Sequence, residues 1–232
     1  MVAKTIRDEF HRYLSPQLAE KIFLDPELRK SAFNAARARI PATVLLADLR
    51  GFTTISERFR PVEVVELLKQ FFALLTEAAF EHDGAVFPMS ADSMLVAFGV
   101  PVDQVDRTER AFLAARAMLD KFAALAERWE AKYFTEAGLG IGINAGEVIV
   151  GNLSSSAHRS FTLIGDSVNV ARRLGLRARA GELVLSESVK YVLDSRGFDV
   201  KTTRLPTLHL ASGHPMDIFC VPAGRRIDFR TH

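Results

Sequence analysis

The 232-residue sequence predicts a single domain that contains both strands and helices. Residues 43–47 form a short apolar, β-branched run that is typical of a buried strand, and a helical pattern follows shortly after it. Residues 103–129 repeat apolar side chains at helical spacing, whereas residues 138–152 have the glycine-studded pattern of strands. Strands and helices therefore alternate along the chain, after a helical segment at the amino terminus.

Composition indicates an ordinary globular protein with a substantial core, since 48% of the residues are hydrophobic and 25% are charged. Thirty basic and 28 acidic residues nearly balance, so charge gives no reason to propose nucleic acid or an anionic membrane as partner. Cys220 is the only cysteine, which excludes an internal disulfide, and the six histidines lack the spacing of a zinc site. Without an apolar run of membrane-spanning length or a signal peptide, we expect a cytoplasmic protein.

The first predicted helix is amphipathic. Over residues 5–30, the apolar side chains Leu14, Leu18 and Ile22 fall on one face, and Pro16 marks a break. Such a helix either packs on the domain or pairs with its copy in a dimer. The sequence favours neither interpretation.

The elements that follow are defined by periodicity and by glycine or proline. Pro61 suits the first turn of a helix that runs to about residue 80. Residues 138–152 are predicted as two strands joined tightly at Ala145-Gly146-Glu147; the glycines of their GLGIGI run alternate along a strand, which excludes a dinucleotide-binding loop. The other expected elements are a hairpin over 83–99, helices over 103–129 and 166–179, strands over 161–164 and 182–185, a short helix after Ser186, and strands near 198–205 and 216–221.

Two aspartates define the candidate site. Asp48 follows the strand at 43–47 and precedes backbone N–H groups that open a helix, while Asp92 sits in the turn of the hairpin. If the two strands are neighbours in one sheet, the carboxylates lie side by side. Paired carboxylates beside such N–H groups suit Mg²⁺ carrying a nucleoside triphosphate. The alternative is that Asp48 only caps the helix.

A third stretch, FTLIGDSVNVARRLG at residues 161–175, adds an amide and a guanidinium. Asn169 and Arg173 are four residues apart and therefore share a helical face, with Arg172 beside them. These groups can stabilise a transition state in which negative charge builds on phosphoryl oxygens. Taken alone, an Asn and an Arg one turn apart are more often part of a solvated helix face.

Together, ADLRGFTTISE, the hairpin with Asp92, GIGINAGEVIVGNL and FTLIGDSVNVARRL resemble the successive motifs of the class III nucleotidyl cyclase catalytic domain. The resemblance covers about residues 40–222, which leaves residues 1–39 as an N-terminal helical connector and residues 223–232 as a tail. It implies a fold of the α+β class, a ferredoxin-like βαββαβ domain that works as a head-to-tail homodimer, with a nucleoside triphosphate and two Mg²⁺ or Mn²⁺ ions bound at the interface.

The resemblance also assigns roles to single residues. It implies that Asp48 and Asp92 hold the metal ions. Asn169 and Arg173 correspond to a pair that reaches across from the partner subunit, Asn169 orienting the ribose and Arg173 neutralising the pentavalent phosphorus. The remaining positions are the phosphate-receiving turn, at Leu49, Gly51, Phe52 and Thr53, and the base-binding positions, at Pro88 and Thr162.

Two positions depart from the family pattern GGxxxKxxGD. The lysine that recognises adenine corresponds to Pro88, which offers neither a donor nor a charge. The glycine before the second aspartate is Ala91, which is expected to strain a turn that favours glycine. Three interpretations follow: an active cyclase with altered base reading, a weak adenylate cyclase, and a degenerate domain that binds nucleotide as a regulatory module. A related palm-like enzyme that joins two nucleotides is disfavoured, because GG[DE]EF is missing.

Because both aspartates, Asn169 and Arg173 are retained, we expect an adenylate cyclase that converts ATP to 3′,5′-cyclic AMP and pyrophosphate. The ribose 3′-hydroxyl attacks the α-phosphorus; one metal lowers the pKa of the hydroxyl and the other steadies the triphosphate, so no side-chain base is required. Threonine at position 162 resembles adenylate-type members. A guanylate or other-base cyclase is the alternative, since Pro88 weakens base selectivity.

Overall fold

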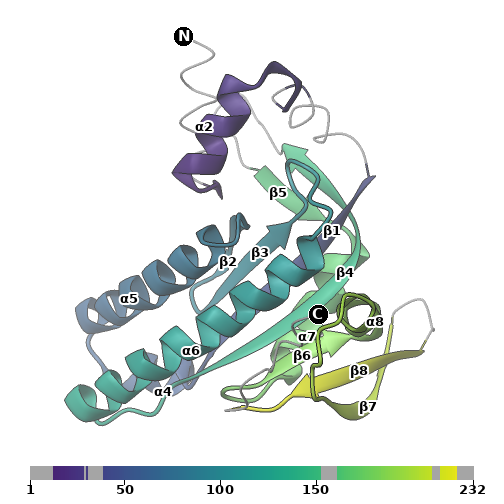
Figure 1. Ribbon diagram of the computed structural model, residues 1–232. Coiled ribbons are helices and arrows are strands. Elements are labelled where there is room, and N and C mark those ends of the chain that lie inside the picture. Colours follow the sequence, from purple (N-terminus) through teal and green to yellow (C-terminus); the bar gives the residue numbers. More distant parts are fainter. Residues whose placement is uncertain (1–12, 29, 31–38, 153–160, 211–214, 224–232) are drawn as a thin grey trace.

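The computed structural model describes residues 13–28, 30, 39–152, 161–210 and 215–223. Its strands are β1 (Arg39–Arg50), β2 (Ala85–Ser90), β3 (Ser93–Phe98), β4 (Gly138–Asn152), β5 (Phe161–Ile164), β6 (Leu183–Ser186), β7 (Thr203–His209) and β8 (Pro215–Val221). Its helices are α2 (Pro16–Leu24), α4 (Phe52–Arg58), α5 (Pro61–Phe80), α6 (Arg107–Tyr133), α7 (Asp166–Arg177) and α8 (Glu187–Ser195). Figure 1 shows these helices arranged around one twisted sheet.

The first half of the chain builds a ferredoxin-like unit. Strand β1 pairs antiparallel with β3 on one side and with β4 on the other, and β2 completes a hairpin with β3. The resulting order β2-β3-β1-β4, with α4 and α5 before β2 and α6 before β4, gives the βαββαβ pattern. The predicted α+β, ferredoxin-like fold class is therefore confirmed. Beyond β4 the sheet continues through β6, β8 and β7, and β5 pairs separately with β4.

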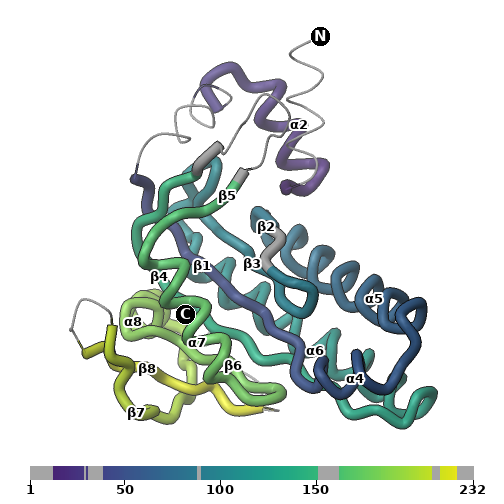
Figure 2. The backbone as a smooth tube through the Cα atoms, turned by 180° about the vertical axis from the view of Figure 1, so that it is seen from behind, coloured from purple at the N-terminus to yellow at the C-terminus, as the bar shows by residue number. Residues whose placement is uncertain are grey.

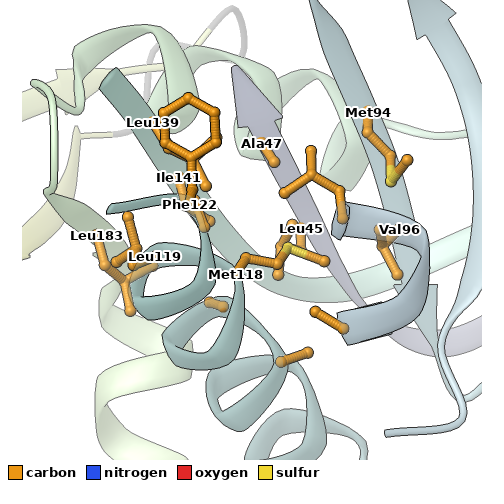
Figure 3. Close-up of a cluster of buried hydrophobic side chains, with 14 of the residues drawn as sticks. Leu45, Ala47, Met94, Val96, Met118, Leu119, Phe122, Leu139, Ile141 and Leu183 are labelled. Carbon is orange, nitrogen blue, oxygen red and sulfur yellow. The ribbon is translucent and has the colours of Figure 1, made fainter. Parts of the chain in front are cut away.

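Helices α5 and α6 cover one face of the sheet and enclose the main core. Because successive side chains of a strand point to opposite faces, β1 directs Leu45 and Ala47 toward these helices. Figure 3 shows both residues facing Met118 and Phe122 of α6. All four are buried, so the helical spacing of apolar residues in α6 is explained by the burial of one face.

Helix α7 packs on the opposite face of the sheet. Figure 2 shows the molecule turned by 180° from the view of Figure 1. It approaches the sheet closely because the contact is lined with glycine. A Cβ at Gly142 of β4 would lie 2.1 Å from the backbone nitrogen of Gly175, and a Cβ at Gly175 would lie 2.7 Å from Leu46 Cδ2. Any side chain at either position would push the helix away from the strands.

One prediction about this region is wrong. Residues 138–152 form one uninterrupted strand, not two strands joined at Ala145-Gly146-Glu147. Ala145 pairs with Thr43, and Gly146 pairs with Ala42, so β4 stays in register with β1 through the expected turn. The glycine there makes room for α7, because a Cβ at Gly146 would lie 2.2 Å from Ser167 Oγ. Elsewhere the differences concern boundaries: β1 is longer than residues 43–47, and β7 begins later than residue 198.

The amino-terminal helix α2 packs on the domain. Ser15 caps it by accepting a hydrogen bond from Leu18 N (3.1 Å), and Pro16 occupies the first turn. Its buried face, with Leu14 and Ile22, belongs to a cluster on the α7 side of the sheet that includes Val44. The described part of this segment therefore packs on its own domain, while pairing with a second copy stays a prediction. Within the described residues, no helix has the length and apolar character that crossing a membrane requires.

Candidate active site

The carboxyl end of β1 positions Asp48. This residue lies opposite Ser93 of β3 and Gly140 of β4, and it is only 9% exposed. Three residues later, Gly51 turns the chain into α4 with a φ of 86°, and a Cβ there would lie 2.8 Å from Glu136 O. Only glycine suits this turn. No side chain caps α4, so its first N–H groups have no side-chain acceptor at the helix start.

The turn between β2 and β3 positions Asp92 beside Asp48. Leu49 N donates a hydrogen bond to Asp92 O (2.8 Å), which ties this turn to the end of β1. Ser90 Oγ donates to Asp92 Oδ1 (2.7 Å) and so fixes the carboxylate. The strand that ends at Asp48 and the hairpin that carries Asp92 are therefore neighbours, which was the condition for the carboxylates to lie side by side, and both belong to one edge of the sheet.

The electrostatics of this edge favour a bound cation. Burial raises the pKa of the Asp48 carboxyl; the Arg50 guanidinium opposes this rise, the charge of Asp92 adds to it, and Arg172 opposes it. The balance is a raised pKa, which means that the negative charge is incompletely compensated within the chain. A cation beside both carboxylates would supply the missing compensation.

The residues present fit Mg²⁺ or Mn²⁺ held jointly with a phosphate ligand. The described residues contain no cluster of three or more His, Cys, Asp or Glu side chains that could hold a metal ion. Mg²⁺ is commonly bound through one or two carboxylates, with the remaining ligands supplied by substrate phosphates and water. Asp48 and Asp92 match that donor set, since both offer hard carboxylate oxygens at the same edge of the sheet.

Arg50 is a part of the site that sequence reasoning missed. Its Nη1 donates to Asp48 Oδ2 (2.6 Å), and its Nη2 donates to Gly175 O in the last turn of α7. The signal was available, because residues two apart in a strand share a face and Asp48 and Arg50 are two apart.

The predicted pair Asn169 and Arg173 lies exposed on α7, one turn apart. Within the described residues, neither forms a hydrogen bond or ion pair with Asp48 or Asp92 of the same chain. A second residue not foreseen, Asn144 of β4, is buried and donates from Nδ2 to Ser167 O (3.2 Å), which anchors the start of α7. The helix that carries the pair is thus held to the sheet near both of its ends.

The phosphate-receiving turn is placed only in part. Leu49 directs its side chain into the core and its N–H to Asp92 O, so this amide is already engaged within the sheet. Phe52 is half-buried against the core and Thr53 is exposed at the start of α4. Gly51 provides the turn itself.

The base-binding positions lie on two separate strands. Thr162 of β5 is half-buried and pairs with Gly151. Pro88 of β2 pairs with Met94, and the register shifts between Pro88 and Ser90; the Pro88 side chain is outside the described part. The expected strain at Ala91 is not found, because its φ is not among the positive values of the described non-glycine residues.

Residues 36–221 match a family model described as the adenylate and guanylate cyclase catalytic domain. Among curated proteins, adenylate cyclase 1 of Rhizobium meliloti is 33% identical over 149 residues, which are 64% of this chain and 22% of that protein. An adenylate cyclase of Anabaena cylindrica is 29% identical over 189 residues, which are 80% of this chain and 37% of that protein. The chain thus spans between a fifth and two fifths of the length of these relatives.

Solved structures resemble the whole catalytic region. The adenylyl cyclase CyaB from P. aeruginosa has a TM-score of 0.75 at 26% identity, covering 82% of this chain and 97% of that one. The guanylyl cyclase Cya2 has a TM-score of 0.73 at 30% identity, covering 82% of this chain and 95% of that one. Similarity therefore extends to enzymes named for either purine.

Proposed function

Because the chain belongs to the class III adenylate and guanylate cyclase catalytic-domain family, we propose that it converts ATP to 3′,5′-cyclic AMP and pyrophosphate in the cytoplasm, where nucleoside triphosphates are supplied. The observation that carries the proposal is the placement of Asp48 and Asp92 at one edge of the sheet, joined by the Leu49–Asp92 backbone hydrogen bond. Neither aspartate is used as a helix cap or buried in a closed ion-pair network.

The chemistry follows from these two carboxylates and the groups around them. Two Mg²⁺ or Mn²⁺ ions, held by Asp48 and Asp92, would acidify the 3′-hydroxyl and neutralise the triphosphate. Phe52 and Thr53, at the uncapped start of α4, offer backbone N–H groups to phosphate oxygens. Arg50 bonds to only one oxygen of Asp48, Oδ2, so in this proposal Oδ1 is the oxygen available to a metal ion.

The transition-state groups come from a second subunit in this proposal. Asn169 and Arg173 are exposed, and in the part of the chain that the structure describes neither forms a hydrogen bond or ion pair with Asp48 or Asp92, which supports a role toward a partner. In a head-to-tail homodimer, Asn169 orients the ribose and Arg173 compensates the charge that develops on the phosphoryl oxygens. Each dimer then contains two equivalent sites.

The preferred base is the part of the proposal for which there is a second candidate, guanine in place of adenine. The Thr162 hydroxyl can donate or accept a hydrogen bond, so it does not by itself separate adenine from guanine. We favour ATP because two curated relatives are named adenylate cyclases. The 30% identity to a guanylyl cyclase favours GTP as the alternative substrate.

One assay series tests the proposal. Purified protein is incubated with ATP, GTP, CTP or UTP, each with Mg²⁺ or Mn²⁺, and cyclic nucleotide is quantified. We expect most product from ATP, and none from Asp48→Ala or Asp92→Ala. Absence of product from every nucleotide and metal, in a folded dimer, would overturn catalysis and leave a regulatory nucleotide-binding module.

The shared site is tested by mixing inactive chains. Asp48→Ala and Arg173→Ala homodimers should both be inactive, whereas their heterodimer contains one site with an intact Asp48 and an intact Arg173 and should regain activity. If isolated heterodimers stay inactive while the wild type is active, the site is built within one chain.

A further inference from the structure

The guanidinium of Arg50, at the end of β1, bonds both to Asp48 of its own strand and to helix α7. On one side, Nη1 donates to Asp48 Oδ2 at 2.6 Å. On the other side, Nη2 donates to the carbonyl of Gly175. Gly175 lies two residues beyond Arg173 on α7. The positively charged guanidinium of Arg50 therefore lies at the carboxyl end of α7, where the helix dipole favours positive charge.

The surroundings of Arg50 are shaped to hold the guanidinium in this position. A Cβ at Gly140 would lie 2.8 Å from both Nε and Nη2 of Arg50, so the absence of a side chain at Gly140 creates the space for it. The Nε atom is fully enclosed and has no hydrogen-bond partner among the described residues. Enclosing an unpartnered N–H has a cost, and the two bonds made by the rest of the fork offset it.

We propose that Arg50 is a positioning residue that links the metal-binding Asp48 of one active site to α7, the helix that serves the other active site of the dimer. This inference rests on the proposed function, because it takes Asp48 as a metal ligand and Asn169 and Arg173 as groups that act on the partner's substrate. Arg50 donates a hydrogen bond to Asp48 Oδ2, which leaves Oδ1 for the metal ion. The same side chain donates to Gly175 O and so holds the end of α7 in position on the sheet.

Two effects of removing Arg50 have opposite signs, which makes the inference testable. A positive charge beside a metal site repels the metal, so loss of the charge alone would tighten metal binding. Loss of a partner that orients the ligand instead weakens metal binding, typically by about 10–100-fold. Because Asp48 is largely buried and is held by Arg50, orientation is the effect that we expect to dominate.

The first experiment measures metal binding without catalysis. Free Mn²⁺ is followed by electron paramagnetic resonance during titration of the nucleotide-free dimer. We expect Arg50→Gln to weaken Mn²⁺ binding at least tenfold. Unchanged or tighter binding in Arg50→Gln would overturn the proposal.

The matched control is a substitution of Arg110, another arginine whose guanidinium donates to two acceptors. Arg110 donates to Asp106 Oδ1 (2.7 Å) and Asp83 Oδ2 (2.8 Å), away from Asp48. Arg110→Gln therefore also removes a guanidinium that binds two acceptors, and it should leave Mn²⁺ affinity unchanged. An equal loss of affinity in Arg110→Gln would show that the effect of Arg50→Gln is a general loss of structure and would overturn the positioning role.

The second experiment asks whether Arg50 acts through α7. Heterodimers of Asp48→Asn and Arg173→Ala chains contain one intact site, to which the first chain contributes α7 and the second contributes Asp48. Arg50→Lys is introduced into one chain at a time; lysine keeps the charge but does not provide a fork that reaches both acceptors. We expect kcat to fall about tenfold with either placement.

The outcomes separate the inference from the proposed function. If Arg50→Lys lowers kcat only in the chain that contributes Asp48, Arg50 is a local partner of that carboxylate and the link to α7 is refuted. If the wild type makes no cyclic nucleotide, the proposed reaction fails, and the Mn²⁺ titration still decides whether Arg50 positions Asp48.

Discussion

Replacing Gly142 by alanine is the sharpest test of how α7 sits on the sheet. The added carbon would lie 2.1 Å from Gly175 N, 2.6 Å from Leu174 C and 2.7 Å from Ala171 O, and all three are backbone atoms. A normal contact is about 3.5 Å, so α7 must retreat by more than about 1 Å. Side-chain rearrangement does not relieve such a clash.

The retreat has a cost in stability and a cost in catalysis. Overpacking a well-packed interface typically lowers the free energy of unfolding by about 1–3 kcal/mol. Because the added carbon meets the backbone of α7, we expect a loss of about 3 kcal/mol. For a chain of this size, each kcal/mol lowers Tm by about 2–4 °C, which gives a decrease of about 6–12 °C. Because α7 carries Asn169 and Arg173, a misplacement of about 1 Å should lower kcat about a hundredfold.

Thermal unfolding and steady-state kinetics measure both effects, with Gly197→Ala as control. Gly197 has no atom within 4 Å of an added Cβ, and its φ of 81° leaves only the cost of a left-handed conformation, about 1–2 kcal/mol. Gly142 does not have a left-handed φ, so this backbone cost is absent from Gly142→Ala, and a Tm loss larger than that of Gly197→Ala reports crowding against α7. A Tm for Gly142→Ala no lower than that of Gly197→Ala, or an unchanged kcat, would refute the close packing of α7.

Three further outcomes are expected. Phe71→Ala, at a fully buried position, should lower the free energy of unfolding in urea by about 3–5 kcal/mol, whereas Phe134→Ala, at a side chain 78% exposed, should change it by less than about 0.5 kcal/mol; similar effects would contradict the assigned core. Pro88→Lys should raise the ATP-to-GTP ratio of kcat/KM about tenfold, and a constant ratio would place base reading elsewhere. Burial, followed by the charge of Glu182, raises the pKa of Cys220 from 9.0 to about 11; the folded pKa is the higher one, so this group's contribution to stability is complete below pH 9 and is lost as pH rises through about 11. The urea midpoint of the wild type should therefore fall more than that of Cys220→Ala between pH 9 and 11, and parallel pH profiles would contradict a buried thiol.

Most of the fold follows from local periodicity. The apolar spacing in α6 and the β-branched run in β1 each reflect burial of one face, so both elements were predicted near their observed positions. The long strand β4 was not, because its Ala145-Gly146-Glu147 segment has the composition of a turn. The glycines at 138, 140, 142 and 146 all fall on the same face of a strand, since they are separated by even numbers of residues. This spacing indicates one continuous strand with a helix packed closely on its glycine face.

The candidate site divides in a similar way. The sequence indicated Asp48 at a strand end and Asp92 in a hairpin turn but left open whether the two strands are neighbours; the pairing of β1 with β3 answers that question. The engagement of the Leu49 amide by Asp92 O was not predictable, since it depends on the depth at which the hairpin turn sits beside β1. The role of Arg50 depends likewise on Gly175, which is 125 positions away in sequence and is brought near only by tertiary packing.

The pairing of β1 with β4 has a consequence for synthesis of the chain. Residue 39 pairs with residue 149, so one edge of β1 has no partner until about 110 more residues have been translated. The hairpin formed by β2 and β3 reaches β1 earlier, and it leaves a long apolar strand with an open row of N–H and C=O groups. At about 5–20 residues per second, that edge stays open for roughly 5–20 seconds. Ribosomes that pause before residue 152 should therefore expose an aggregation-prone intermediate, which a chaperone or faster elongation through residues 100–152 would protect.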